Sequence, residues 1–225
     1  MLGRLEFLPG TRNQGAIEDL YGLKVLRVRT DPEGRLGGYR LNRAGAALRR
    51  GGAGRVLLPE GFSRWDMVKR FGLCPVDPAP FLHFCAPELA VEGLRRRDMD
   101  PAGATVALSG SRVDGAMARA AMRLCPRVRR LVIRGAGGAE LALRLWEEYG
   151  IPVLPPEEPA HLGLNFQPGG YGTEEHSLTL YGPKPDLCGG GVSFPALKEG
   201  DRADLPLLCA LWEGGRLDAE GLKFT

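Results

Sequence analysis

The chain has 225 residues, of which 44% are hydrophobic and 25% charged, and its formal net charge is +3. These values are ordinary for a globular protein of one large or two small domains. Only five of the 30 basic residues are lysine, and an arginine excess is typical of a GC-rich bacterial genome. Acidic residues lie among the basic ones throughout, so we expect no stripe that binds nucleic acid.

The five cysteines exclude a disulfide framework and a structural zinc site, because their number is odd and no pair has CxxC spacing. The first seven residues do not resemble a signal peptide. No apolar run reaches the roughly 18 residues that a membrane span needs. We therefore expect a cytoplasmic protein that does not contact a membrane.

Short apolar strands alternate with helices in the first 98 residues, and such alternation indicates parallel pairing. The predicted strands are an edge strand at 5–8, a hairpin of 17–20 with 24–30, and strands at 55–58 and 73–76. The predicted helices are 39–50, 62–71 and 79–97. Pro87 lies inside the third helix and predicts a kink or a break into two helices.

A polar segment at 98–103 reads as a linker, so we predict two lobes, 1–98 and 99–225, with one continuous sheet as the alternative. The second lobe has the more regular pattern. Its predicted strands are 105–108, 130–133, 151–154, 161–166, 176–181 and a last edge strand at 222–224. Its predicted helices are 116–124, 139–149 and 205–212, and a Gly/Pro-rich irregular loop spans 182–203.

The expected fold class is therefore α/β: a Rossmann-like parallel sheet with helices on both faces, preceded by a smaller mixed α/β lobe. Short connections between apolar strands fit right-handed crossovers.

Two glycine-rich turns join a strand to a helix in the second lobe. Such turns offer free backbone N–H groups and the positive end of a helix dipole, both of which favour a phosphate. The candidate ligand-binding residues of the first turn are Gly110, Ser111, Arg112 and Gly115. Those of the second turn are Gly135 and Gly137, with Arg134 just before them. A purely structural role for both turns is the alternative.

The order of strand, Gly110-x-x-x-x-Gly115, helix, strand, Arg134, helix and strand is followed by Asn165, Pro168 and Gly170. Over about residues 104–172 this order resembles the cofactor half of the shikimate dehydrogenase and glutamyl-tRNA reductase group of Rossmann domains. The resemblance implies NAD or NADP as cofactor, Arg134 as a contact of the NADP 2′-phosphate, and Asn165 as a cofactor-binding residue.

The family's G-x-G-x-x-G pattern is broken in this chain. Arg112 stands at the middle glycine, where a side chain either blocks the pyrophosphate or holds a phosphate through its guanidinium. Asp114 would repel a phosphate. The segment that carries the catalytic lysine of shikimate dehydrogenases does not occur in residues 1–100, and Cys74 and Cys85 do not match the nucleophile motif of glutamyl-tRNA reductases.

Other candidates each have a structural alternative that we favour. They are the His83/Cys85 pair, His161 with His176, the Cys188-Gly-Gly-Gly loop, and the cations Arg127, Arg129 and Arg130 as a site for an acidic partner. A cleft lined by Glu60, Gly110 and Asn165 is a further hypothesis, because ligands of open parallel sheets bind at the carboxyl ends of strands.

Three functional hypotheses follow. The first ranked is a non-catalytic, Rossmann-derived protein that binds a nucleotide or a small phosphorylated metabolite. The second is a divergent NAD(P)-dependent oxidoreductase. The third is a structural or interaction module, for example a homodimer.

Overall fold

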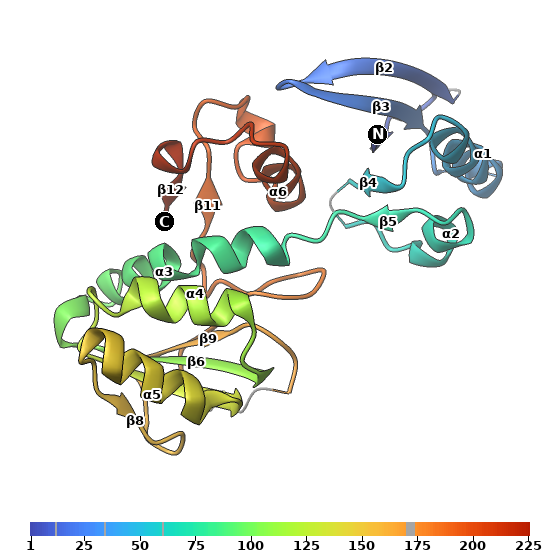
Figure 1. Cartoon of the computed structure of the whole chain (residues 1–225). Coiled ribbons are helices and arrows are strands. Elements are labelled where there is room, and N and C mark those ends of the chain that lie inside the picture. Colours follow the sequence, from blue (N-terminus) through green and yellow to red (C-terminus); the bar gives the residue numbers. More distant parts are fainter. Residues whose placement is uncertain (12, 34, 60, 170–173) are drawn as a thin grey trace. The chain divides into compact units, whose positions relative to one another are not determined.

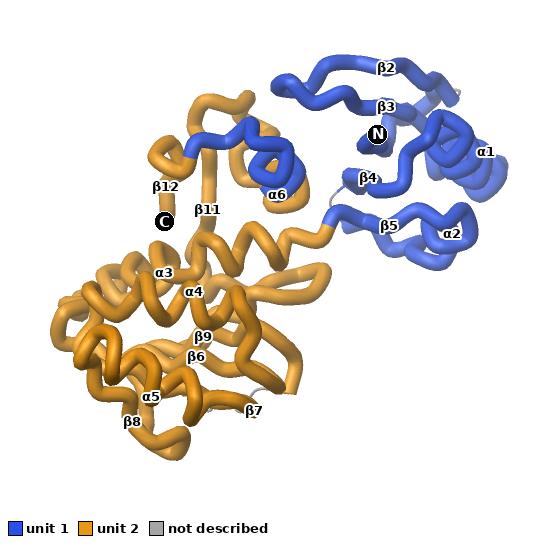
Figure 2. The backbone as a smooth tube through the Cα atoms, viewed as in Figure 1, with its two compact units in different colours: residues 1–76, 209–218 blue, residues 77–208, 219–225 orange. Residues whose placement is uncertain are grey.

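A computed structural model describes residues 1–11, 13–33, 35–59, 61–169 and 174–225. The chain forms two compact units, one of residues 1–76 with 209–218 and the other of 77–208 with 219–225 (Figure 2). The expected boundary near residue 100 thus falls inside the second unit. The reason is that the long helix α3 (Ala79–Arg95) packs against helix α4 (Gly115–Leu124) and strand β9 (Leu162–Asn165) of that unit.

The first unit contains a mixed five-stranded sheet in the order β2-β3-β1-β4-β5 (Figure 1). Its strands are β1 (Leu2–Phe7), β2 (Gln14–Leu20), β3 (Leu23–Thr30), β4 (Arg55–Leu57) and β5 (Cys74–Pro75). The pair β2/β3 is the expected antiparallel hairpin, and the other neighbours are parallel. Its helices are α1 (Gly37–Arg50) and α2 (Trp65–Arg70).

The first strand differs from the expected edge strand, because β1 pairs with both β3 and β4 and is therefore central. Its Leu5 is 3% exposed and packs with Val28 and Val56 of those neighbours in the core of the unit. A short apolar run that ends at a Pro9-Gly10 turn does not indicate whether a strand pairs on one side or on both. The C-terminal segment also joins this unit, where Glu213 forms an ion pair with Arg55 of β4.

The second unit is built on a parallel five-stranded sheet in the order β10-β9-β6-β7-β8. Its strands are β6 (Thr105–Arg112), β7 (Arg130–Ala136), β8 (Val153–Leu154), β9 (Leu162–Asn165) and β10 (Ser177–Thr179). Numbered in chain order and read from β8, the strands run 3-2-1-4-5, which is the order of a Rossmann sheet. The expected Rossmann-like α/β class is confirmed.

Three helices pack on one face of this sheet, namely α3, α4 (Gly115–Leu124) and α5 (Gly138–Tyr149). Gly93 of α3 lies so close to the sheet that a Cβ on it would contact Leu162 of β9, and a Cβ on Gly138 of α5 would contact Ile133 of β7. Met117 of α4 lies against Gly110 of β6. The strand register places these contacts on the same face. Arg134 lies on the opposite face of the sheet, where it contacts the segment 155–158.

The structure differs from the expected helices and strands at a few positions. Helix α3 continues through Pro87 as one helix and does not divide. The region 182–203 contains β11 (Val192–Ser193), which pairs with β12 (Lys223–Phe224), and a 3-10 turn. Helix α6 (Leu205–Glu213) follows. Among the described residues, no helix has the length and apolar character that crossing a membrane requires.

The core of the second unit depends on the middle of β6, so truncation there is expected to be costly. Leu108 is fully buried, and Leu108→Ala should lower the free energy of unfolding by about 2–5 kcal/mol. Leu143 is 59% exposed, and Leu143→Ala should change it by less than about 0.5 kcal/mol. Urea denaturation followed by circular dichroism measures both; equal losses would contradict this description of the core.

Candidate functional site

The strand order of the second unit reverses between β6 and β9, and the crevice at the carboxyl ends of such strands is where open α/β sheets bind ligands. Strand β6 ends at Arg112 and strand β9 at Asn165. The residues that follow these ends therefore form the candidate site.

A chain of hydrogen bonds between side chains spans this point. The Ser111 hydroxyl donates to Gln167 Oε1 at 2.8 Å, and Gln167 Nε2 donates to Asp114 Oδ2 at 2.6 Å. Ser111 is exposed, whereas Gln167 and Asp114 are half-buried. The carboxyl ends of these two strands are thus followed by a hydroxyl, an amide and a carboxylate that already bind one another.

Asp114 also closes the first glycine turn to anions. Its Oδ1 accepts hydrogen bonds from the backbone N–H groups of Ala116 and Met117, both at 2.9 Å, and so caps α4. Burial opposes its ionisation, but the bonds from Met117, Gln167 and Ala116 outweigh burial and lower the pKa of Asp114. The amides expected to hold a phosphate at this turn therefore hold a carboxylate of the chain itself.

His83 of α3 reaches the same cluster. Its Nε2 lies 3.1 Å from the carbonyl oxygen of Phe166, and its ring lies 4.9 Å from the Phe166 ring. Burial lowers the pKa of His83, and the charges of Asp114 and Asp77 offset this only in part. Near neutral pH the imidazole is therefore neutral, with Nε2–H donating to the carbonyl and Nδ1 carrying the lone pair.

Sequence reasoning paired His83 with Cys85 and missed its contact with Phe166, the residue before Gln167. The signal available for this part of the site was Asp114, because an aspartate directly before a helix is a strong N-cap. Cys85 points elsewhere: it is buried, and burial raises its pKa to about 12, which leaves the thiol protonated.

The two glycine turns owe part of their composition to close packing. Strand β6 continues past a bulge to pair Arg112 with Ala136, and Val113 N–H donates to the carbonyl of Ala136 at 2.8 Å. A Cβ on Gly135, whose φ is 145°, would lie 2.6 Å from the carbonyl oxygen of Gly110. Gly135 thus lets the two strand ends approach, whereas Gly110 makes room for Met117 of α4.

The second turn differs from the first because nothing caps the helix that follows. Gly137 is the N-cap of α5 with φ 84°, and no side chain of the described part of the chain caps the first amides of the helix. The residues 135–137 are exposed, and a Cβ on Gly137 would meet only Val113, at 3.8 Å. The first helical residue, Gly138, is buried, whereas Ala139 and Glu140 after it are exposed. A helix start without a side-chain cap suits an anion.

Arg112 lies beside this start. Its Cα is 3.4 Å from the Cβ position of Gly135, and its side chain is exposed. Its guanidinium makes no hydrogen bond or ion pair with any residue that the structure describes. Gly115, by contrast, starts the capped helix α4 and faces Arg119.

Arg134 and Asn165, the other two expected cofactor contacts, lie on the sheet face away from the helices. Arg134 is 5% exposed; it forms an ion pair with Glu174 and donates to the carbonyls of Pro156 and Glu158. These contacts occupy each of its three donor nitrogens. Glu60 and Gly170, which were also proposed as site residues, lie outside the described residues.

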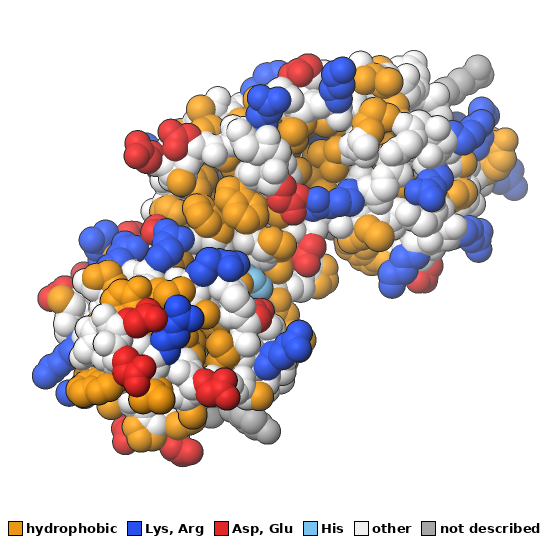
Figure 3. Space-filling model, viewed as in Figure 1, with side chains coloured by type: hydrophobic (Ala, Val, Ile, Leu, Met, Phe, Trp, Pro, Cys, Tyr) orange, Lys and Arg blue, Asp and Glu red, His pale blue; other side chains and the backbone are white. Residues whose placement is uncertain are grey.

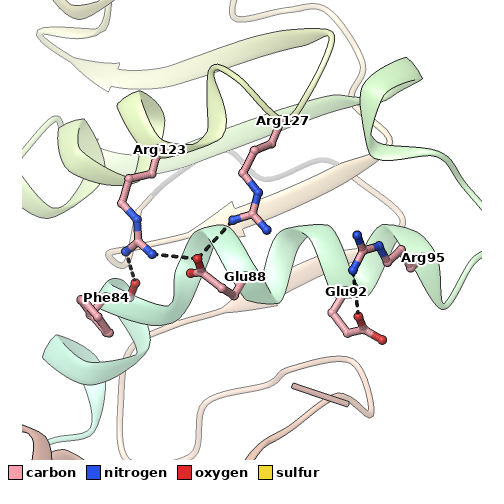
Figure 4. A network of polar contacts seen from close by, with 6 residues as sticks. All are labelled: Phe84, Glu88, Glu92, Arg95, Arg123 and Arg127. Atoms are coloured by element: carbon pink, nitrogen blue, oxygen red, sulfur yellow. Dashed lines mark hydrogen bonds and ion pairs between the residues drawn. The ribbon is translucent and has the colours of Figure 1, made fainter. Parts of the chain in front are cut away.

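Four of the remaining candidate regions include a residue with structural contacts, namely Arg127, His161, Cys188 and, as described above, His83. Arg127 and Arg123 both bind Glu88, at 3.1 and 2.7 Å, and join α4 to α3 (Figure 4). His161 Nδ1 accepts the N–H of Thr105 at 2.9 Å. Cys188 is exposed, and its thiol lies 3.1 Å from the carbonyl oxygen of Ser177. The described residues contain no group of three His, Cys, Asp or Glu side chains able to hold a metal ion.

A cavity of about 420 Å³ lies in the first unit, beside the ion pair of Arg55 and Glu213. Leu2, Leu23 and Arg55 on its wall are the first residues of their strands. It therefore sits at the amino ends of parallel strands, opposite to the end where such sheets bind ligands. On the face drawn in Figure 3, acidic and basic side chains are interspersed with apolar ones on both units.

No protein-family model matches the chain, and no curated protein matches its sequence. Among solved structures, the L-tryptophan dehydrogenase from Nostoc punctiforme is similar at a TM-score of 0.32 and 16% identity. The match covers 73% of this chain and 55% of the dehydrogenase, so the chain spans about half the length of that protein. A TM-score this low carries no argument about function.

The cap at α4 gives the first prediction for this site. Asp114→Ala should lower the free energy of unfolding by about 0.5–2 kcal/mol, because two helix amides lose their acceptor. Glu140→Ala, in the first turn of the uncapped helix α5, should cost less than about 0.5 kcal/mol. Chemical denaturation compares the two, and an equal cost would show that Asp114 is not a significant cap.

The lowered pKa of His83 gives a pH dependence. Its folded-state pKa lies below the ordinary 6.5, so acidification protonates the unfolded chain first. The stability that neutral His83 contributes is complete above pH 6.5 and is lost as the pH falls through the folded-state pKa. When the pH is lowered from 7.5 to about 5, the melting temperature of the His83→Gln variant should therefore fall less than that of the wild type. Identical losses would contradict the assignment.

Proposed function

We propose that this chain is a non-catalytic, Rossmann-derived binding protein for a nucleotide or another small phosphorylated ligand, held at the start of α5. The observation that carries the proposal is the contrast between two helix N-termini. Asp114 caps α4, whereas α5 begins at an exposed glycine turn without a side-chain cap. An uncapped helix N-terminus favours a phosphate through its free N–H groups and its dipole.

Two neighbouring features support this position. The exposed side chain of Arg112 arises next to Gly135, so a guanidinium is available to a bound anion. The Ser111–Gln167 pair lies at the strand-order reversal and offers hydroxyl and amide groups for the non-phosphate part of a ligand. Of the two candidate glycine turns, the second is therefore the proposed site of the phosphate.

The alternative of an NAD(P)-dependent oxidoreductase has less support. A dinucleotide in the family's arrangement needs the first turn for its pyrophosphate, and Asp114 occupies the amides there. The residue expected to contact the 2′-phosphate, Arg134, is buried in an ion pair. Binding of NADPH with a measurable hydride transfer to any carbonyl substrate would favour this alternative.

A charge placed at the helix start tests the site. Ala139 is exposed in the first turn of α5, and Ala139→Glu should weaken binding of pyrophosphate or ADP by about tenfold through repulsion. The fold should remain intact, because glutamate is favourable in the first turn of a helix. Isothermal titration calorimetry at low ionic strength measures the change.

The matched control is Leu143→Glu, which adds the same charge on an exposed face of the same helix one turn further on. It should leave the affinity within about twofold of the wild type, since the dipole effect falls off after the first turn. Equal affinity of the Ala139→Glu and control variants, or no binding of either probe to the wild type at millimolar concentration, would overturn the proposed site.

A further inference from the structure

The sheet face opposite the helices carries polar residues at the carboxyl ends of three adjacent strands. Ser109 of β6 is in register with Arg134 of β7 on one side and with Asn165 of β9 on the other. Neighbouring strands lie about 4.8 Å apart, so these three side chains stand in a row on one face. Ser109 is fully buried and Arg134 is 5% exposed.

Glu174 enters this face from the segment before β10. Its side chain is 2% exposed and forms an ion pair with Arg134. The backbone makes room for the carboxylate at Gly163, two residues before Asn165 on the same strand face, where a Cβ would lie 3.0 Å from Glu174 Oε2. The carboxylate therefore lies over the sheet, next to the row of polar side chains.

The hydrogen-bonding capacity of this cluster is only partly used. Glu174 Oε2, Ser109 Oγ and Asn165 Oδ1 are all buried, and none of them has a hydrogen-bond partner among residues 1–11, 13–33, 35–59, 61–169 and 174–225. Buried polar atoms in folded proteins nearly always have partners, and a half-satisfied polar cluster is less stable than an apolar one. The amide of Asn165 can present its nitrogen instead of its oxygen, because the two ends of an amide are interchangeable in assignment.

We infer that Arg134, Ser109 and Asn165 form a binding site for a carboxylate group, and that Glu174 occupies it as a stand-in from the same chain. The guanidinium supplies the charge, and the hydroxyl and the amide supply two further donors. The tethered Glu174 reaches the first and leaves the other two unused. A free carboxylate-bearing ligand can be oriented to use all three, and it would displace Glu174.

The route to the site is short. Arg134 is covered by the carbonyls of Pro156 and Glu158, and both of these residues are exposed. The carboxylate site is independent of the phosphate proposed at α5, since it lies on the other face of the sheet and uses none of the same residues.

Removing the stand-in tests this inference by chemical rescue. Glu174→Ala leaves Arg134 buried without its counter-charge, and the melting temperature should fall by roughly 6–20 °C. Sodium acetate should then restore much of the loss in a saturable way, with half its effect at about 1–10 mM, whereas sodium chloride at equal ionic strength should not. Wild-type protein should show no acetate-specific shift, because the tethered Glu174 has the higher effective concentration.

Two further variants distinguish a built site from a plain cavity. Adding Ser109→Ala or Asn165→Leu to Glu174→Ala should weaken the acetate effect by about tenfold each, because each removes a donor to a charged ligand. The matched control is Glu88→Ala, which removes a partly exposed carboxylate bound by two arginines. It should show no acetate-specific recovery.

Several outcomes would overturn the inference. One is that acetate acts no better than chloride on Glu174→Ala. Another is that the Ser109 and Asn165 variants leave the acetate effect unchanged, which would mean that the unpaired atoms hold only ordered water. If Glu174→Ala does not fold in chloride, recovery of its circular dichroism in acetate supports the site, and failure to fold in both salts refutes it. Glu174→Gln, which keeps the volume, should fold and be insensitive to acetate.

Discussion

The pairing of β6 with β7 on one side and β9 on the other is the constraint on which the second unit depends. Val106, Ala107 and Leu108 in the middle of β6 have no exposed surface. Because side chains alternate along a strand, this one strand assigns its residues to two different environments. Gly110 lies against α4 on one face, while Ser109 stands between Arg134 and Asn165 on the other.

The chain's own carboxylates occupy two of the positively charged positions near the carboxyl end of this sheet. Asp114 takes the first amides of α4, and Glu174 takes the guanidinium of Arg134. In each case an intramolecular carboxylate satisfies donors that would otherwise attract an anion from solution. Helix α5 is different, because its glycine turn carries no side chain that could act in this way.

The three positions therefore differ in whether a group of the chain itself already occupies them. A ligand at α5 meets bare backbone and displaces only water. A ligand at Arg134 must compete with a tethered group, so only a ligand that uses Ser109 and Asn165 as well gains over Glu174. A ligand at α4 would have to displace a helix cap whose pKa is already lowered by its hydrogen bonds, which makes that position the least favourable of the three.

The sequence by itself determined the local elements of the second unit, since apolar runs of strand length and helical periodicity with glycine stops depend on nearest neighbours. It also placed the hairpin of the first unit and the strand–turn–helix order around Gly110 and Gly135. Tertiary structure alone decided that β1 is central, that α3 belongs to the second unit, that Gln167 binds Asp114 and that His83 contacts Phe166. It also decided that Arg134 faces Glu174 and not a cofactor. These outcomes depend on strand register and on which face of the sheet a helix covers. Both are fixed by contacts between residues far apart in the chain, and such contacts leave no local pattern in the sequence.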